Sequence, residues 1–240
     1  MKWLDLTLPT PAENLAADEA LLDWREENGG ENILRFWESP RPFVVVGYAN
    51  KIATETDAAA CEAKGIPIFR RCSGGGTVLQ GPGCLSYALI LRITANSPLA
   101  GISGANRFIM EQNRRAIASL LPGSEISVRG HTDLARDHFK FSGNSQRRRR
   151  QFLLFHGTFL LNFDLALVGG CLRMPSREPD YRRRRRHEEF LTNLNVSAAS
   201  VKAALREIWR AGSLLEDPPL NEIATLARMK YETREWNFKF

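Results

Sequence analysis

The glycine-rich segment at residues 70–78, RRCSGGGTV, constrains this chain more than any other stretch of its sequence. Three adjacent glycines carry no Cβ, so their backbone can approach a ligand closely and adopt positive φ angles. Successive N–H groups in such a loop can surround an anion, and the two preceding arginines can neutralise a phosphate or carboxylate. The segment is neither a Walker loop nor a Rossmann fingerprint. It predicts a site for a nucleotide phosphate or an acyl-adenylate, with a structural hairpin as the alternative.

A second block of polar residues lies further along the chain. It reads GHTDL at residues 130–134, KFSGNSQ at 140–146 and HGT at 156–158. A lysine ahead of a Ser-Gly turn can reach into a cleft and hold an acyl carbonyl and a phosphate while negative charge develops on them. The same lysine without its neighbours would be interpreted as an ordinary surface residue, because most lysines are exposed.

Together, the two blocks resemble the two signatures of the lipoate–protein ligase A family, in the same order along the chain. The first match continues beyond residue 78 with Gly83, Leu85, Tyr87 and Ile90. The family likeness extends to the N-terminal helix with Asp18 and Glu19, and to the segment that begins MPSREPDYR at residue 174. It covers residues 10–235, sparsely outside the two blocks.

The resemblance implies that Lys140 is the catalytic residue, with Asp133 as its acidic partner. It also implies that the glycine-rich loop wraps a lipoyl-adenylate. The residues it assigns to ATP, the adenylate or the pocket are Arg70, Arg71, Ser73, Gly74, Gly75, Gly76, Thr77, Val78, Leu79, Ser142, Gly143, Asn144, His156, Gly157 and Thr158. Two positions depart from the family pattern, since Gln80 replaces a common histidine and Cys84 a common asparagine.

The periodicity of apolar residues predicts helices interleaved with strands, without a strict βαβ rhythm. We therefore expect an α+β fold with a mixed sheet flanked by helices, in a single domain over residues 1–240. The resemblance implies the catalytic core shared by lipoate and biotin ligases. Strands are expected at residues 33–37, 43–46, 66–69 and 85–93 and within 134–163, and helices at 12–24, 53–64, 106–121, 197–209 and 220–229.

Four cysteines bear on the type of reaction: Cys61, Cys72, Cys84 and Cys171. None has Cys-x-x-Cys or zinc-finger spacing, so we expect free thiols and no bound metal. Related octanoyltransferases attack an acyl thioester with a thiolate, and the ligase-like subgroup places that cysteine just before the lysine block, where this chain has none. The other branch places it after the His-Gly strand, so Cys171 is the alternative nucleophile, and Arg173 and Arg177 would help lower its pKa.

The net charge of +6 is concentrated in two arginine runs, residues 147–150 and 182–186. Such local basicity favours an anionic partner on one face, although charge runs are often only solvated surface. Nine arginines exceed what the nearby acids Glu178, Asp180, Glu188 and Glu189 can neutralise. We expect the runs to steer an acidic acceptor domain toward the bound adenylate.

The function expected from these features has two steps. ATP, with Mg²⁺, and lipoate or octanoate give acyl-AMP, and a lysine of a lipoyl domain of a 2-oxoacid dehydrogenase or of the glycine cleavage H protein then takes the acyl group. The alternatives are octanoyl transfer from acyl carrier protein through Cys171, or a non-catalytic module that binds an acyl-adenylate or nucleic acid.

The partners and cellular location are expected from what the chain lacks. Only about thirty residues follow residue 209, too few for a further domain. The resemblance therefore implies that a separate small protein assists adenylate formation. With no long apolar run and no secretory signal, we expect a cytoplasmic monomer without a membrane or nucleic-acid partner.

Overall fold

The computed structural model describes all residues, 1–240, and contains two β-sheets. The larger has eight strands in the order β11-β1-β2-β6-β10-β9-β8-β7, and the smaller has the order β4-β3-β5. The strands are β1 (Lys2–Asp5), β2 (Ile33–Trp37), β3 (Phe43–Val46), β4 (Ile68–Arg70), β5 (Val78–Gln80), β6 (Cys84–Arg92), β7 (Ile126–Arg129), β8 (Asp133–Arg136), β9 (Phe139–Arg148), β10 (Phe152–Leu160) and β11 (Ser213–Leu214).

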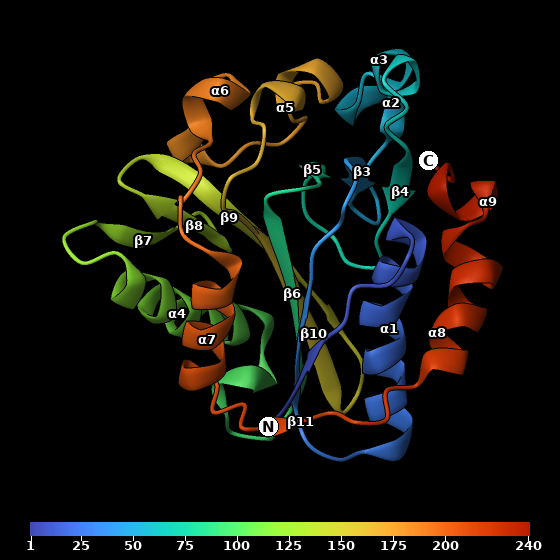
Figure 1. Cartoon of the computed structure of the whole chain (residues 1–240), viewed down its shortest axis with the longest axis vertical. Helices are drawn as coiled ribbons and strands as arrows, with labels where there is room; N and C mark the ends of the chain where they lie inside the picture. The colour runs from blue at the N-terminus through green and yellow to red at the C-terminus, as the bar shows by residue number, and fades with distance from the viewer.

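Helices cover both faces of the large sheet, as Figure 1 shows. Helices α1 and α8 lie on one face, with the small sheet, and α4 and α7 pack on the other. Short helices α2, α3, α5 and α6 gather at one end of the sheets. The helices are α1 (Pro11–Asn28), α2 (Ile52–Glu55), α3 (Ala58–Ala63), α4 (Ile102–Leu120), α5 (Ala166–Cys171), α6 (His187–Phe190), α7 (Ala198–Ile208), α8 (Leu220–Leu226) and α9 (Arg234–Asn237), with 3₁₀ turns η1 (Pro98–Ala100) and η2 (Asp180–Arg182) and the π turn η3 (Ala227–Tyr231).

The large sheet is mixed, which confirms the expected fold class. Strand β1 runs parallel to β2 and β11, whereas β2, β6, β10, β9, β8 and β7 pair antiparallel in turn. The central strands β2 and β6 are mostly apolar and almost wholly buried, as expected of strands covered on both faces, and Arg35 is the charged exception inside β2. No helix combines the length and apolar character needed to cross a membrane.

Helix α1 positions acidic side chains against the sheet. Thr10 and Glu13 form a capping box that satisfies backbone donors at its first turn. Asp18 and Glu19 are each only 2% exposed on the face that packs inward. The sequence predicted this helix, which extends four residues beyond the expected end.

The single helix expected over residues 53–64 is wrong, because the chain forms α2 and α3 instead. Thr56 is extended, and its N–H closes the last turn of α2 on Ile52. The Asp57 side chain then accepts a hydrogen bond from the backbone N–H of Ala60 at 3.0 Å and starts α3. The helix expected over residues 220–229 is also shorter than predicted. Helix α8 ends at Leu226, and the π turn η3 follows it.

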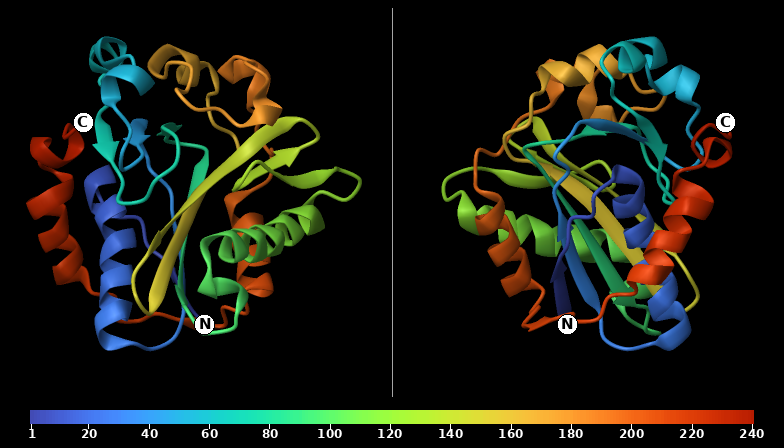
Figure 2. Two further views of the ribbon diagram at one scale, coloured as in Figure 1. Left: turned by 180° about the vertical axis from the view of Figure 1, so that it is seen from behind. Right: turned by 45° about the vertical axis from the view of Figure 1, so that its right-hand side comes forward.

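The C-terminal helix α8 and the π turn η3 pack along α1 (Figure 2). Lys230 and Tyr231 both bind the carboxylate of Glu19, at 2.6 and 2.7 Å. Trp236 donates its indole N–H to the carbonyl of Arg70 at 2.8 Å. The C-terminal helices therefore brace β4, the strand that leads into the glycine-rich loop.

The turn between β5 and β6 yields a stability prediction, because Gly83 has φ +86° and a Cβ there would lie 2.2 Å from the Asn162 carbonyl oxygen. Gly83→Ala should destabilise the protein by at least about 2 kcal/mol, and so lower Tm by about 4–8 °C. Differential scanning calorimetry measures this. Gly212→Ala is the matched control, since nothing lies within 4 Å of that position. Equal Tm values for the two variants would contradict the assigned turn.

Candidate active site

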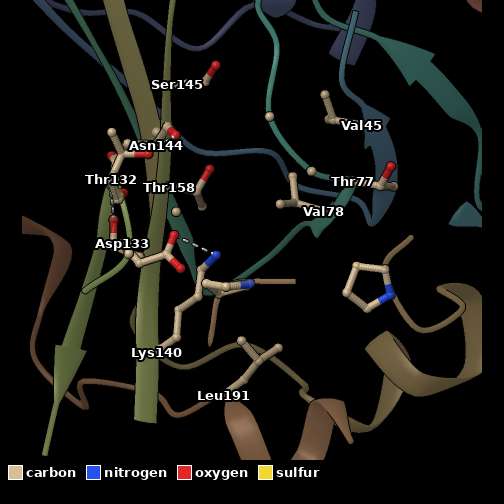
Figure 3. Close-up of a pocket in the computed structure, with 18 of the residues that line it drawn as sticks. Val45, Thr77, Val78, Thr132, Asp133, Lys140, Asn144, Ser145, Thr158 and Leu191 are labelled. Carbon is tan, nitrogen blue, oxygen red and sulfur yellow. Dashed lines mark hydrogen bonds and ion pairs between the residues drawn. The ribbon is translucent and has the colours of Figure 1, made fainter. Parts of the chain in front are cut away.

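One cavity of about 1050 Å³ lies between the large sheet and the small one. The glycine-rich loop, α1 and the segment of residues 172–191 complete its walls. Figure 3 shows Lys140 and Asp133 on one side of it, with Thr77, Val78 and Val45 opposite. The two blocks singled out in the sequence therefore meet across a single space.

The floor of the cavity is a row of residues in register across five strands of the large sheet. The row is Trp37, Ser86, Thr158, Gly143 and Asp133, from β2, β6, β10, β9 and β8. All five line the cavity. Because neighbouring strands lie about 4.8 Å apart, this row extends roughly 19 Å from an aromatic end to a charged end.

Lys140 and Asp133 form an ion pair at the charged end. The Lys140 Nζ atom lies 2.8 Å from Asp133 Oδ1, and the two side chains are 22% and 14% exposed. Tyr181 donates its hydroxyl to the other oxygen of Asp133 at 2.8 Å, and burial raises the pKa of this phenol further above its ordinary value. Gly143 makes room for the pair, since a Cβ there would lie 2.9 Å from the Lys140 ammonium. The turn expected at Ser142 and Gly143 is wrong, because both residues lie within strand β9, and Gly143 instead has a packing function.

Arg71 holds the glycine-rich loop from inside. Its guanidinium donates to the carbonyls of Gly74 and Gly76, at 2.5 and 2.8 Å. The hydroxyl of Ser145, on β9, donates to the same Gly74 carbonyl at 2.8 Å. Burial lowers the pKa of Arg71 to about 10, so it remains a cation at neutral pH. With the carbonyls turned toward Arg71, the loop is fixed before any ligand arrives.

A buried chain of hydrogen bonds connects α1 to the loop. Arg35 donates to Asp18 at 2.6 Å, Asp18 lies 2.8 Å from Nδ1 of His156, and Nε2 of His156 lies 2.5 Å from the Ser73 hydroxyl. Ser73 also accepts a hydrogen bond from Arg71 at 3.1 Å. The Ser73 hydroxyl thus joins Arg71 to His156, and the Asp18 carboxylate holds the other ring nitrogen of His156.

Most of the pocket residues expected from the sequence line the cavity, but Arg70, Ser73 and Gly74 do not. Arg70 is fully buried, and its guanidinium donates to the carbonyls of Gly47, Tyr48, Asn50, Trp236 and Asn237. It is a brace between the loop and the C-terminal segment rather than a residue facing a ligand. Ser73 acts on the loop through Arg71 and His156.

The cavity also contains residues that the sequence had not assigned to it. Asp18 and Tyr181 were noted only as parts of matching segments, and Gln80 only as a departure from the family pattern. Tyr87 lies outside the lining and supports it, since it donates to Asn144 at 2.6 Å and accepts from Asn113 of α4 at 2.6 Å. Alternation along β5 could have indicated Gln80, because it lies two residues after Val78, which was expected to line the pocket. Nothing local could have indicated Tyr181.

The four cysteines are free, buried and absent from the cavity lining. Burial raises the pKa of Cys61, Cys72 and Cys84 to about 12, which keeps them as thiols at neutral pH. Cys171 is 0% exposed and lies in an apolar cluster with Cys61 and Cys84. The structure therefore does not bring Cys171 to the site.

Comparison with known proteins agrees with this geometry. The family model of the lipoyl protein ligase A/B catalytic domain matches residues 10–208. The chain belongs to that family. An octanoyltransferase, LipM, of Geobacillus kaustophilus is 26% identical in an alignment of 272 positions that covers 99% of this chain and 98% of that protein. LipM of Carboxydothermus hydrogenoformans is 28% identical in an alignment of 273 positions that covers 100% of this chain and 98% of that protein.

A solved structure shares the fold. It is a bipartite lipoate–protein ligase of Thermoplasma acidophilum, described with its E2 lipoyl domain, with a TM-score of 0.81 and 25% identity. The match covers 99% of this chain and 95% of that one. The expected family and its α+β catalytic core are thus confirmed, and this chain is a lipoate–protein ligase-like enzyme.

The chain from Asp18 to Ser73 predicts how the loop is held. Ser73→Ala leaves Arg71 and His156 each without one buried partner, at a cost of about 1–2 kcal/mol. Amide hydrogen exchange of residues 71–79 should therefore become roughly 5–30-fold faster. Ser119→Ala, on α4, is the control and should leave the loop unchanged. Equal loop protection in the two variants would mean that this chain does not hold the loop.

Proposed function

We propose that this protein activates lipoate or octanoate with ATP to form acyl-AMP, and then transfers the acyl group to a lysine of an acceptor protein. The observation that carries the proposal is the Lys140–Asp133 pair facing the glycine-rich loop across one cavity, with charged walls at one end and apolar walls at the other. A mixed carboxylic–phosphoric anhydride has the same division, with an apolar chain joined to an anionic phosphate.

Lys140 has the geometry to stabilise the charge that develops at this junction. An ammonium has three donors, and Asp133 occupies one of them, so the others are available to an acyl oxygen and an α-phosphate oxygen. Asp133 is itself held by Tyr181, so the ammonium is positioned in advance. Such fixed donors stabilise a transition state without reorganisation during the reaction.

The two steps then follow from the bound groups. In the first, a carboxylate oxygen attacks the α-phosphorus of ATP, the bond to the β-phosphate breaks, and pyrophosphate leaves. In the second, a neutral lysine amine of the acceptor attacks the acyl carbon, an amide forms, AMP leaves with the electron pair of the broken C–O bond, and the amine releases a proton. Mg²⁺ would enter with ATP through its phosphates, since it usually binds through substrate oxygens.

A second candidate is octanoyl transfer without ATP. The LipM relatives are named octanoyltransferases, and this chain matches nearly their whole length. That chemistry needs a thiolate that can reach an acyl thioester. The buried state of all four cysteines argues against it in this chain. We therefore rank the ATP-dependent reaction first and transfer through Cys171 second, ahead of a non-catalytic binding module.

The proposal is tested by incubating the protein with a lipoyl domain, ATP, Mg²⁺ and either lipoate or octanoate, with product measured by intact mass. Lys140→Ala should lower the rate by about 10²–10³-fold, because a fixed charge stabiliser is lost. Cys171→Ser should retain most of the activity and serves as the control.

Three outcomes would contradict the proposal. They are near-normal turnover in Lys140→Ala, absence of pyrophosphate release even with a separate accessory protein present, and an acyl adduct on Cys171 when octanoyl-carrier protein replaces the free acid and ATP. The last would establish the transferase. If adenylate forms only after a separate small protein is added, the bipartite arrangement described for the T. acidophilum ligase would apply here too.

The structure alters the expected docking of the acceptor. Three arginines of the first run are used internally: Arg147 reaches Glu19 and the Cys72 carbonyl, Arg148 the Leu99 carbonyl, and Arg149 pairs with Asp23. The count of acids near the nine arginines was therefore incomplete, because Glu19 and Asp23 of α1 pair with Arg147 and Arg149 of the first run.

The second run keeps free charges beside the cavity. Arg183, Arg184 and Arg186 are exposed, next to lining residues such as Tyr181 and Arg182. Arg183 and Arg184 both have positive φ, at 53° and 58°, which turns the chain sharply there. We infer that these three arginines, rather than the first run, guide an acidic acceptor domain to the cavity.

Replacing Arg183, Arg184 and Arg186 together with Gln should raise KM for the acceptor domain and flatten its dependence on salt. Exposed charges act mainly on association and are screened beyond about 8 Å at physiological salt. The rate of pyrophosphate release from ATP and lipoate should not change. Arg150→Gln, which removes the exposed arginine of the first run, is the control. An unchanged acceptor KM at low salt would exclude this docking site, and duplex DNA binding under the same conditions would favour the nucleic-acid alternative.

A further inference from the structure

Five acidic side chains line the cavity: Asp18, Glu55, Asp133, Glu178 and Asp180. Three of them pair with an arginine or a lysine, and Asp180 is exposed to solvent. Glu55, at the end of α2, is only 4% exposed and forms no ion pair. A buried carboxylate whose charge nothing balances costs free energy, so its presence in a cavity wall points to a function.

Only one oxygen of the Glu55 carboxylate is used within the protein. Oε1 accepts hydrogen bonds from the backbone N–H of Ser176, at 3.3 Å, and from the Ser176 hydroxyl. Oε2 accepts none, yet it is not sealed off from the cavity as the amide oxygen of Gln80 is. The carboxylate is therefore held in a fixed place with its second oxygen open to a ligand.

The chain segment that closes the cavity connects Glu55 to Lys140. Arg173 donates its backbone N–H to the Glu55 carbonyl at 3.0 Å, and its own carbonyl oxygen lies 3.1 Å from Nε2 of His187. Leu191 closes the next turn on His187 and forms an isolated bridge with Lys140. All five residues line the cavity. The free oxygen of Glu55 and the ammonium of Lys140 thus face one space.

We propose that Glu55 is the group that accepts a proton from the acceptor lysine in the second step. This inference rests on the proposed function, because it requires that a lysine is acylated in this cavity. As the nitrogen bonds to the acyl carbon it becomes acidic, and Oε2 of Glu55 takes one proton from it. The nitrogen keeps its other hydrogen as the amide, AMP leaves with the electron pair of the broken C–O bond, and Glu55 then releases its proton to water.

The charges of the cavity favour Glu55 for this step. Lys140 is a cation paired with Asp133 and stabilises the acyl oxygen, so it cannot also accept a proton. The three exposed arginines inferred to guide the acceptor belong to the segment that joins Glu55 to Lys140. An acceptor docked on them would extend its lysine beneath that segment, where a carboxylate attracts an amine through a charge-assisted hydrogen bond.

The test compares two nucleophiles in single turnovers from preformed acyl-AMP. One is a lipoyl domain, and the other is hydroxylamine, whose low basicity lets it attack without a protein base. Glu55→Gln keeps an oxygen for Ser176 but cannot accept a proton, so transfer to the lipoyl domain should slow by about 10²-fold. Hydroxamate formation and ATP–pyrophosphate exchange should not change. Glu62→Gln, which removes an exposed charge from α3, is the matched control and should leave all three rates unchanged.

Two results would overturn the inference. One is equal transfer to the lipoyl domain by Glu55→Gln and the wild-type protein. The other is equal slowing with both nucleophiles, which would show that Glu55 only braces Ser176.

Failure of the proposed function gives a different result, because the wild-type protein then forms no adenylate. Transfer from octanoyl-carrier protein to the lipoyl domain tests Glu55 in that case, since the same lysine must lose a proton. A slower rate in Glu55→Gln would support the inference, and an unchanged rate would overturn it. If neither donor acylates the lipoyl domain, both proposals are refuted.

Discussion

The buried ion pair of Arg35 and Asp18 is the interaction on which the site depends. Arg35 lies on β2 at the centre of the sheet, Asp18 on α1, and both side chains are almost completely buried. Breaking such a pair leaves an uncompensated charge in the interior and costs about 3–5 kcal/mol. Asp18 uses its second oxygen to hold His156, which holds Ser73. The position of the glycine-rich loop is thus tied to the packing of α1 on the sheet.

Local sequence patterns identified most residues at the charged end of the cavity, but they did not show which side chains point into it. The family resemblance implied Asp133 as the partner of Lys140, and β8 and β9 bring the two side chains to 2.8 Å. The two arginines before the glycines were both expected to contact the ligand, yet only Arg71 lines the cavity. Adjacent residues of an extended chain point to opposite sides, so only one could. Which one depends on Asn237, far along the chain, which binds Arg70.

Long-range pairing also explains what the sequence could not show about charge. Asp23 lies 126 residues from Arg149, so counting acids near the arginine run missed it. Tyr181 reaches Asp133 across 48 residues through a segment whose only regular structure nearby is a 3₁₀ turn. Periodicity predicts which face of a helix is buried, but it carries no information on what that face meets. These contacts could be identified only in the three-dimensional structure.

The same cavity could serve two chemistries, and the placement of the thiols favours one of them. Lys140, the glycine-rich loop and the apolar end would stabilise an acyl group equally well on a phosphate or on a cysteine. A cysteine pathway needs a thiolate that meets the acyl carbon, and here Cys61, Cys84 and Cys171 pack in an apolar cluster, while Cys72 lies in another. Moving any of them into the cavity would require local unfolding of the core. We propose that ATP activates the acyl group, because apolar walls beside Arg71 and Lys140 are suited to an acyl-adenylate.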